Sequence, residues 1–290
     1  MSNGFLNSSF VRRLADTRLG RWARDGFIHR SLLKSSGDWR YPFMAFGWAV
    51  ASFLTRRRTV SVDGVKVSLP CKNWITHFRW YLYKTKEIEV RRYIDEYVKD
   101  KDVFFDIGAN IGVFTLYTGK KHPGATVYAF EPEYSNLALL KENIIANDLT
   151  DTVKPFSVGI ADTNGFSLLH LQDLDEGAAA HTENPQHIPE TAEGFKVRWC
   201  EGITVATLDH ICEQLDVVPN TMKIDTDGNE PKVLAGATKL LANNAFRSMI
   251  IEMPIPDDDR KACEDILAAN GFHKAWHDPD KTRNEVWARE

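Results

Sequence analysis

Short, continuously apolar runs alternate with longer amphipathic segments from about residue 100 onward. Five apolar runs have the length and composition of buried strands: 103–107, 126–130, 153–160, 221–225 and 248–252. Apolar residues at helical spacing predict helices between them, over 112–121, 134–147, 205–215, 230–242 and 258–270. This alternation predicts an α/β fold with a doubly wound, mostly parallel sheet that is covered by helices on both faces.

A different pattern precedes this region and divides the chain into three predicted parts. Residues 59–70 alternate apolar and polar positions around Asp63-Gly64, a strong hairpin signal, and 85–100 has helical spacing. Residues 59–102 are therefore interpreted as a hairpin and helix cap. Residues 1–58 are interpreted as a basic, aromatic helical extension, and 103–290 as the main domain.

Two segments of the main domain depart from the regular alternation. A long insertion, 161–204, separates the third and fourth strands and is strand-like at 166–171 and 195–199. At the end of the chain, KAWHDPD and EVWARE suit an antiparallel hairpin that closes the edge of the sheet.

Charge is distributed unevenly along the chain. Its 290 residues are 43% hydrophobic and carry a net charge of -4, so the composition is that of a globular protein and does not favour nucleic acid as a partner. Residues 1–60, however, contain eleven Lys or Arg and three Asp or Glu, a charge of +8. The apolar stretch 41–55 is shorter than the ~20 residues of a membrane span and is followed by three arginines. It is either a buried helix or an anchor at a membrane surface.

The cysteines and the N-terminal sequence indicate the cellular compartment of the protein. Four scattered cysteines include no C-x-x-C pair, and MSNGFLNSSF lacks the pattern of a secretory signal. We therefore expect a cytoplasmic protein with reduced thiols, with membrane-surface association through residues 1–58 as an extension of that expectation.

The first strand of the main domain ends in DIGANIGVFTL, where Asp106 precedes a glycine turn. Ligands of open α/β sheets bind at the carboxyl ends of strands. Gly108 permits a tight turn, and Gly112 permits close approach at the helix start. The G-x-G-x-x-G pattern is absent, and an acid here would repel a dinucleotide pyrophosphate. Asp106 instead suits a cofactor with a positive centre, such as S-adenosyl-L-methionine; the alternative is a residue that only caps the turn.

A second acid, Glu131, ends the next strand in AFEPEY. A carboxylate there can accept hydrogen bonds from both ribose hydroxyls of an adenosine, as it also does in NAD sites. Pro132 then stops the strand. Alone, Glu131 could be an exposed strand-end acid, but together with Asp106 it predicts an adenosyl cofactor.

Further carboxylates follow the fourth and fifth strands. MKIDTDGNEPKVLAGA places Lys223 and Asp225 on a buried strand end, and IIEMP adds Glu252. Such a cluster can deprotonate a hydroxyl, or it can hold a divalent metal such as magnesium through Asp225 and Glu252. A structural alternative is that Asp227-Gly228 makes a turn and Glu230 stabilises the helix N-terminus.

Six motifs together resemble the FkbM-type family of S-adenosylmethionine-dependent methyltransferases over about residues 80–255. They are DIGANIGVFTL, AFEPEYSNLALLKENIIAN, SVGIADTNG, ATLDHIC, MKIDTDGNEPKVLAGA and IIEMP. The resemblance implies a class I methyltransferase fold, which is Rossmann-like, and methyl transfer to a hydroxyl, often of a sugar or a secondary metabolite.

The resemblance also implies roles for single residues. Those near the methionine portion of the cofactor would be Asp106, Gly108, Asn110 and Gly112. Glu131 and Pro132 would lie at the ribose, and Asp162 near the adenine edge. Asp227 stands where the family commonly has glutamate, and Asn229 where a small or apolar residue is common, which leaves the metal question open.

The predicted reaction is therefore O-methylation of a small-molecule or glycan acceptor. Asp225, directly or through a metal, is the candidate base, with His181 and His187 as rivals in the insertion. An N-methyltransferase and a non-catalytic cofactor-binding scaffold are the alternatives. The aromatic residues of 1–58 could contact a membrane, a sugar or a second subunit in a homo-oligomer.

Overall fold

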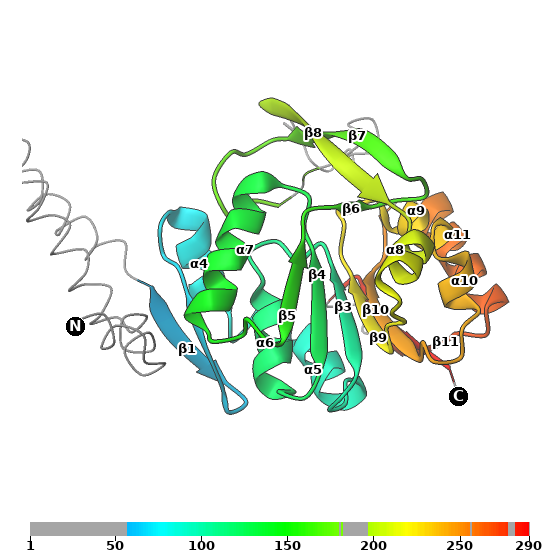
Figure 1. The fold of residues 1–290 in the computed structure, drawn as a ribbon, viewed down its shortest axis with the longest axis horizontal. Helices are drawn as coiled ribbons and strands as arrows, with labels where there is room; N and C mark the ends of the chain where they lie inside the picture. Colours follow the sequence, from blue (N-terminus) through cyan, green and yellow to red (C-terminus); the bar gives the residue numbers. More distant parts are fainter. Residues whose placement is uncertain (1–56, 180, 182–196, 256, 278–281, 290) are drawn as a thin grey trace, which may run out of the picture. The chain divides into compact units, whose positions relative to one another are not determined.

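The computed structural model describes residues 57–179, 181, 197–255, 257–277 and 282–289. The predicted extension, apart from residues 57 and 58, and its membrane contact lie outside them. The described residues from Arg57 onward form one compact unit (Figure 1). None of the helices in the described part of the chain is long and apolar enough to cross a membrane.

A seven-stranded sheet forms the centre of this unit, in the order β11-β12-β10-β9-β3-β4-β5. Its parallel part consists of β5 (Val153–Phe156), β4 (Thr126–Phe130), β3 (Val103–Ile107), β9 (Thr221–Ile224) and β10 (Ser248–Glu252). β12 (Asn284–Ala288) is antiparallel to both β10 and β11 (His273–His277), so the predicted closing hairpin is confirmed. The doubly wound α/β class is likewise confirmed.

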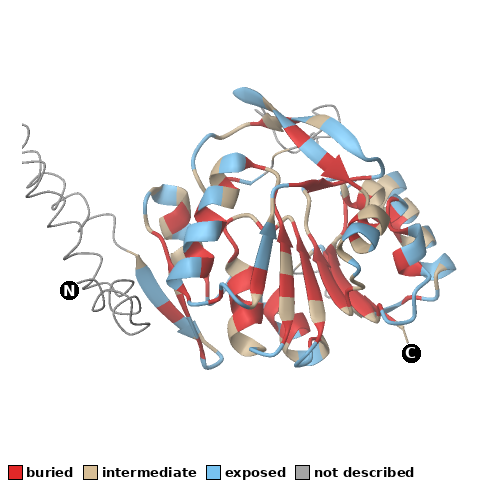
Figure 2. Ribbon diagram, in the orientation of Figure 1, coloured by how far each residue is buried: buried red, intermediate tan, exposed pale blue. Residues whose placement is uncertain are grey.

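Helices cover both faces of the sheet because side chains alternate along each buried strand. Phe104 packs with α5 (Ile88–Tyr97), α6 (Val113–Lys121) and α7 (Tyr134–Ala146) on one face. Phe105 packs on the other face with α8 (Leu208–Leu215), α9 (Glu230–Ala235), α10 (Thr238–Leu241) and α11 (Asp257–Ala269). Figure 2 shows the resulting buried central strands.

The predicted hairpin is confirmed as β1 (Arg58–Val62) and β2 (Val65–Leu69). Asp63 and Gly64 have φ of 50° and 78°, as a tight two-residue turn requires. Asn147, after α7, holds the hairpin against the main domain: its Oδ1 accepts from Ser68 N at 2.7 Å and its Nδ2 donates to Ser68 O at 2.9 Å. A helix not predicted from the sequence, α4 (Trp74–Leu82), follows and begins with a capping box at Asn73 and Thr76.

Several predicted elements have different bounds in the structure. The strand predicted over 153–160 divides into β5, at the sheet edge where Pro155 needs no donor, and β6 (Gly159–Ile160). β6 joins β7 (Gly165–Leu171) and β8 (Trp199–Ala206) in a separate three-stranded sheet, so the strand predicted at 195–199 begins at its last residue.

The helix predicted over 230–242 is two helices, α9 and α10. Gly236 lies so close to the Ala161 carbonyl that a Cβ there would overlap it. Asp209 caps the second helix from a distant part of the chain, accepting from Lys239 N and Leu240 N at 2.8 and 2.9 Å. Similarly, Thr207 accepts from His210 N, which starts α8 at Leu208 rather than at the predicted residue 205.

Candidate active site

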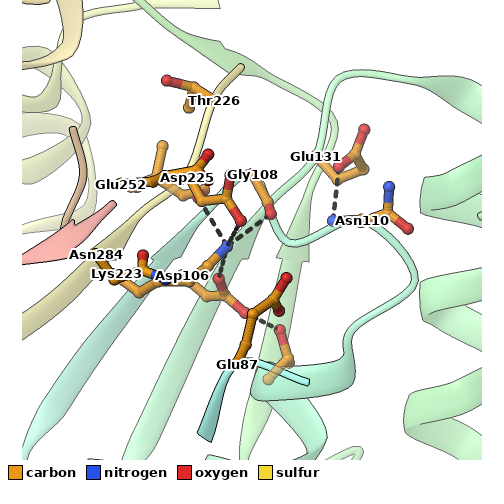
Figure 3. Close-up of polar contacts among 12 residues, drawn as sticks. Glu87, Asp106, Gly108, Asn110, Glu131, Lys223, Asp225, Thr226, Glu252 and Asn284 are labelled. Carbon is orange, nitrogen blue, oxygen red and sulfur yellow. Dashed lines mark hydrogen bonds and ion pairs between the residues drawn. The ribbon is translucent and has the colours of Figure 1, made fainter. Parts of the chain in front are cut away.

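A cavity of about 220 Å³ lies at the carboxyl ends of the parallel strands (Figure 3). β3 and its following turn contribute Gly108 and Asn110, β4 is followed by Glu131, and β9 by Asp225. Glu252, the last residue of β10, lies beside Asp225. The topology thus brings together acids that lie far apart in the sequence, at the edge where open α/β sheets bind ligands.

The glycines of the first turn permit contacts within the chain. Gly108 has φ of 72°, and a Cβ there would overlap the Asp225 carbonyl oxygen. Gly112 has φ of 87°, and its Cβ would overlap the Leu140 side chain. Gly108 lines the cavity, whereas Gly112 does not. The close approach at Gly112 is therefore between the start of α6 and the Leu140 side chain of α7.

Asp106 occupies a different place from the one expected. Its side chain is 1% exposed and does not line the cavity. Its Oδ2 accepts a hydrogen bond from Thr115 Oγ1 at 2.5 Å, and its Oδ1 lies 3.3 Å from Lys223 Nζ. Asp106 thus does not face the cavity in the structure, because the acid is enclosed beneath the turn and neutralises a buried lysine. Its contact with a cofactor stays a prediction.

Lys223, which sequence reasoning assigned no role, is the centre of this arrangement (Figure 3). Its Nζ donates to Gly108 O at 2.9 Å and lies 3.5 Å from Asp225 Oδ2. Burial opposes its charge, but Asp106 and Asp225 prevail and raise the pKa of Lys223. A charged residue within an apolar strand was the available signal. Lys223 joins the turn after β3 to the acid after β9.

Glu131 lines the cavity at the tip of β4 and is 6% exposed. Asn110 N donates to its Oε2 at 2.7 Å, and Glu133 N donates to its Oε1 at 2.9 Å. Burial nevertheless raises the pKa of Glu131 to about 7. Two backbone donors thus fix the orientation of a carboxylate that still reaches the cavity.

Two other predicted cofactor residues have different positions. Pro132 lines the cavity next to Glu131. Asp162 is exposed and does not line it. The expected placement of Asp162 at the adenine edge therefore differs from the structure, in which the chain after β6 points this residue to solvent.

The acidic cluster consists, within the described residues, of Asp225, Asp227 and Glu252, whose ligand oxygens lie within 4.8 Å of one another. Arg283 Nη2 lies 2.7 Å from Glu252 Oε1, and Lys223 lies beside Asp225. Glu252 and Asp225 therefore already have cationic partners. A metal held by Asp225 and Glu252 stays a prediction.

Asp225 and Glu252 also differ in their affinity for protons. Burial opposes the charged form of Asp225, but Lys223 and a hydrogen bond with Glu252 prevail and lower the pKa of Asp225. Burial, together with the charge of Asp225, raises the pKa of Glu252 to about 8. Within this pair, protonation is therefore favoured at Glu252 and ionisation at Asp225.

His181 is the one histidine of the two predicted candidates that falls within the described residues; His187 lies outside them. His181 lines the same cavity as Asp225, and burial lowers its pKa. Its Nδ1 is buried and has no hydrogen-bond partner. A neutral imidazole of this kind can accept a proton.

The segment that precedes His181 is fastened over the cavity. Ala178 O accepts from Asn110 Nδ2 at 2.6 Å and from Asn136 Nδ2 at 3.2 Å. Gly177 N donates to Asn136 Oδ1 at 2.7 Å, and Gly177 O accepts from Arg79 Nε at 2.7 Å. The glycine turn, α7 and α4 therefore all hold this segment, and no sequence pattern predicted that they meet.

A second and larger cavity, of about 790 Å³, adjoins the first. The two share six lining residues: Arg79, Lys86, Glu87, Val113, Phe114 and Ala179. α4 lines the larger cavity with Ile75, Phe78 and Leu82 as well as Arg79. The arrangement offers one compartment at the strand ends and another beneath α4, with a common boundary.

Comparison with known proteins agrees with this architecture. Residues 106–274 match the methyltransferase FkbM domain. The chain belongs to the FkbM methyltransferase family. The predicted family and its Rossmann-like fold are thus confirmed.

Named relatives and one solved structure add detail. The chain is 31% identical over 158 residues to the 31-O-demethyl-FK506 methyltransferase FkbM of Streptomyces tacrolimicus, covering 47% of this chain and 59% of that protein. It is 27% identical over 196 residues to the hexuronic acid methyltransferase AglP of Haloferax volcanii, and the match covers 67% of this chain and 74% of that protein. The crystal structure of a methyltransferase FkbM from Methylobacillus flagellatus KT superposes with a TM-score of 0.47 at 17% sequence identity. The match covers 66% of this chain and 44% of that chain.

Proposed function

We propose that this FkbM-family member is an S-adenosylmethionine-dependent O-methyltransferase that acts on a sugar or secondary metabolite. One observation carries the proposal: the Glu131 carboxylate, held by two backbone N–H groups, faces a cavity bounded by the turn from Gly108. A fixed acceptor at this strand end suits the two hydroxyls of an adenosine ribose.

The donor set of the cavity fits a cofactor with a positive centre. Because Asp106 is neutralised by Lys223, the acids that face the cavity, Glu131, Asp225 and Glu252 among them, take over the role expected of it. Glu131 would hold the ribose, and the turn at Gly108 and Asn110 the methionine portion. When bound, the cofactor supplies an electrophilic methyl carbon.

Asp225 is the proposed general base for the acceptor hydroxyl. It lines the cavity, its side chain is 34% exposed, and Lys223 keeps it ionised. A base positioned within hydrogen-bond reach typically contributes ~10²–10⁴-fold in rate. His181, on the same cavity, is the second candidate.

Relatives support the choice of acceptor. One is named for 31-O-demethyl-FK506, and another for a hexuronic acid. Both names concern those proteins. For this chain they favour a hydroxylated metabolite or sugar, which the cavity beneath α4 would receive.

Calorimetry with S-adenosylmethionine, S-adenosylhomocysteine and NAD tests the cofactor. We expect binding of the first two and none of NAD. Glu131→Gln should weaken S-adenosylhomocysteine about tenfold or more, because one ribose hydroxyl and one backbone donor lose their acceptor. Tighter binding of NAD than of S-adenosylhomocysteine would contradict the proposal.

Asp225→Asn separates catalysis from cofactor binding. We expect release of S-adenosylhomocysteine with a sugar or metabolite panel to fall ~10²-fold or more, while affinity for the cofactor changes little. His181→Gln is the matched comparison. If Asp225→Asn keeps full turnover and His181→Gln loses it, the base is His181. A wild-type chain that binds cofactor without turnover on any acceptor would instead indicate a scaffold.

A further inference from the structure

Arg79 presents an unusual electrostatic situation at the boundary between the two cavities. Its side chain is part-buried, and it lines both cavities. Its single hydrogen bond runs from Nε to Gly177 O, so within the described residues its two terminal nitrogens have no partner. No described carboxylate lies within the 4.0 Å of an ion pair.

The terminal nitrogens of Arg79 are open to the cavity and are not among the buried side-chain atoms without a partner. A ligand in the cavity can therefore reach them. Burial lowers the pKa of Arg79, and the charges of more distant acids, Glu87 foremost, oppose this only in part. Planar arginine side chains bind carboxylates through two parallel N–H donors, and the terminal nitrogens of Arg79 are available for such a contact.

The other cations of the larger cavity are already engaged. Lys86 Nζ lies 2.6 Å from Glu87 Oε1, and an Arg198 terminal nitrogen lies 3.8 Å from Asp173 Oδ1. Arg91 donates to three backbone carbonyls, those of Tyr83, Lys84 and Lys86. Among the described lining residues, Arg79 is therefore the cation that is left to receive a ligand.

The rest of the wall indicates what the ligand looks like. Phe78, Leu82, Val113 and Phe114 form an apolar surface around Arg79. The lining of the larger cavity contains four cations and two acids, so its charge is positive, whereas five acids and four cations line the cofactor cavity. An anion is favoured on the α4 side of the boundary.

We infer that Arg79 binds a carboxylate of the methyl acceptor, so that the acceptor is an acidic molecule with an apolar or ring-shaped body. This inference rests on the proposed function for the identity of the reaction. Arg79 would fix the acid group beneath α4 and thereby direct a hydroxyl toward the cofactor cavity. Neutral analogues would lack this anchor.

Benzoate and benzamide test the inference, because they share a ring and differ in charge. We expect the full-length protein, loaded with S-adenosylhomocysteine, to bind benzoate at least about tenfold more tightly than benzamide. Arg79→Gln should reduce this preference to within about twofold, and Arg79→Lys should retain part of it. Arg92→Gln, which removes one positive charge from an exposed pair with Glu96 outside both cavities, should leave it intact.

Equal binding of the two probes to the wild type, or an unchanged preference in Arg79→Gln, would overturn the inference. So would a finding that Arg79→Gln weakens S-adenosylhomocysteine but not 5′-methylthioadenosine, because Arg79 would then hold the carboxylate of the cofactor itself. If S-adenosylhomocysteine does not bind the wild type, the proposed function fails. In that case, benzoate and benzamide are titrated without cofactor, and a preference for benzoate that Arg79→Gln removes would still support an anion site at Arg79.

Discussion

Asp106 and Lys223 form a buried ion pair whose members are 1% and 4% exposed. Removal of one member leaves the other charged and enclosed, which typically costs ~3–5 kcal/mol. We therefore expect Lys223→Met to lower the free energy of unfolding in urea by about that amount. Asp106→Asn should cost less, because its side chain can still accept from Thr115.

The double variant supplies the control for this prediction. In a double-mutant cycle, Asp106→Asn with Lys223→Met should be more stable than the sum of the single changes implies, since neither charge is then left alone. Additive losses would contradict a direct pairing of the two side chains.

Glu131 should make cofactor binding depend on pH. Its pKa is raised by burial to about 7, so its carboxylate gains full negative charge as the pH rises through that value. The ionised form is the better acceptor for ribose hydroxyls. We expect the Kd of S-adenosylhomocysteine to fall up to about tenfold between about pH 6 and pH 8. Calorimetry at these pH values checks this, and Glu131→Gln should flatten the dependence.

The same shift has the opposite sign for stability of the free protein. Between the ordinary value of 4.5 and about 7 the folded chain holds more protons at Glu131 than the unfolded chain. The contribution of Glu131 to stability is therefore present below that range and is lost as the pH rises through it. In urea unfolding, the free energy of unfolding of the wild type should fall relative to that of Glu131→Gln as the pH rises from about 4.5 to about 7.

At the scale of elements, the predicted strands that lie in the sheet interior agree with the structure. β3, β4 and β10 have the predicted bounds. Their continuous apolar runs are typical of strands that are buried on both faces of a sheet. The breaks between β5 and β6 and between α9 and α10 were not predictable from local pattern. The break between α9 and α10 depends on Ala161 and Asp209, which are distant from it in sequence.

The hairpin β1–β2 should depend strongly on one side chain of the main domain. Asn147 accepts from Ser68 N and donates to Ser68 O, and it is 4% exposed. Asn147→Ala would leave the part-buried Ser68 N–H without its acceptor, at ~1–3 kcal/mol, whereas Ser68 O keeps its hydrogen bond from Arg57. We expect faster hydrogen exchange at the Ser68 amide together with lower stability. Loss of stability without faster exchange at Ser68 would contradict this account.

At the scale of the whole molecule, the sequence located the site but not its internal contacts. Glu131 and Asp225 could be assigned to one edge because strand ends meet there in this fold class. Lys223 and Arg79 could not be assigned, because their surroundings come from β3 and from the segment at Gly177. Asp106 was expected to face the cofactor, and its ion pair with Lys223 could not be predicted because the two residues come from different strands.

Ligand binding should stabilise the unit as a whole, since β3, β4, β9 and β10 all end at the cofactor cavity. At a hundredfold excess over its Kd, S-adenosylhomocysteine should add about 2.7 kcal/mol to the free energy of unfolding. For a unit of this size we expect Tm to rise by about 5–10 °C in differential scanning fluorimetry. NAD at the same concentration is the control, and an equal rise with NAD would contradict the assigned cofactor.

Asn110 contacts both compartments. Its backbone N–H holds Glu131, and its side chain holds Ala178, which lines the wall beneath α4. A ligand that drew Glu131 toward itself would pull on that wall through Asn110. We expect the two substrates to bind in a preferred order, with the adenosyl compound first, because its arrival sets the dimensions of the space that the acceptor enters.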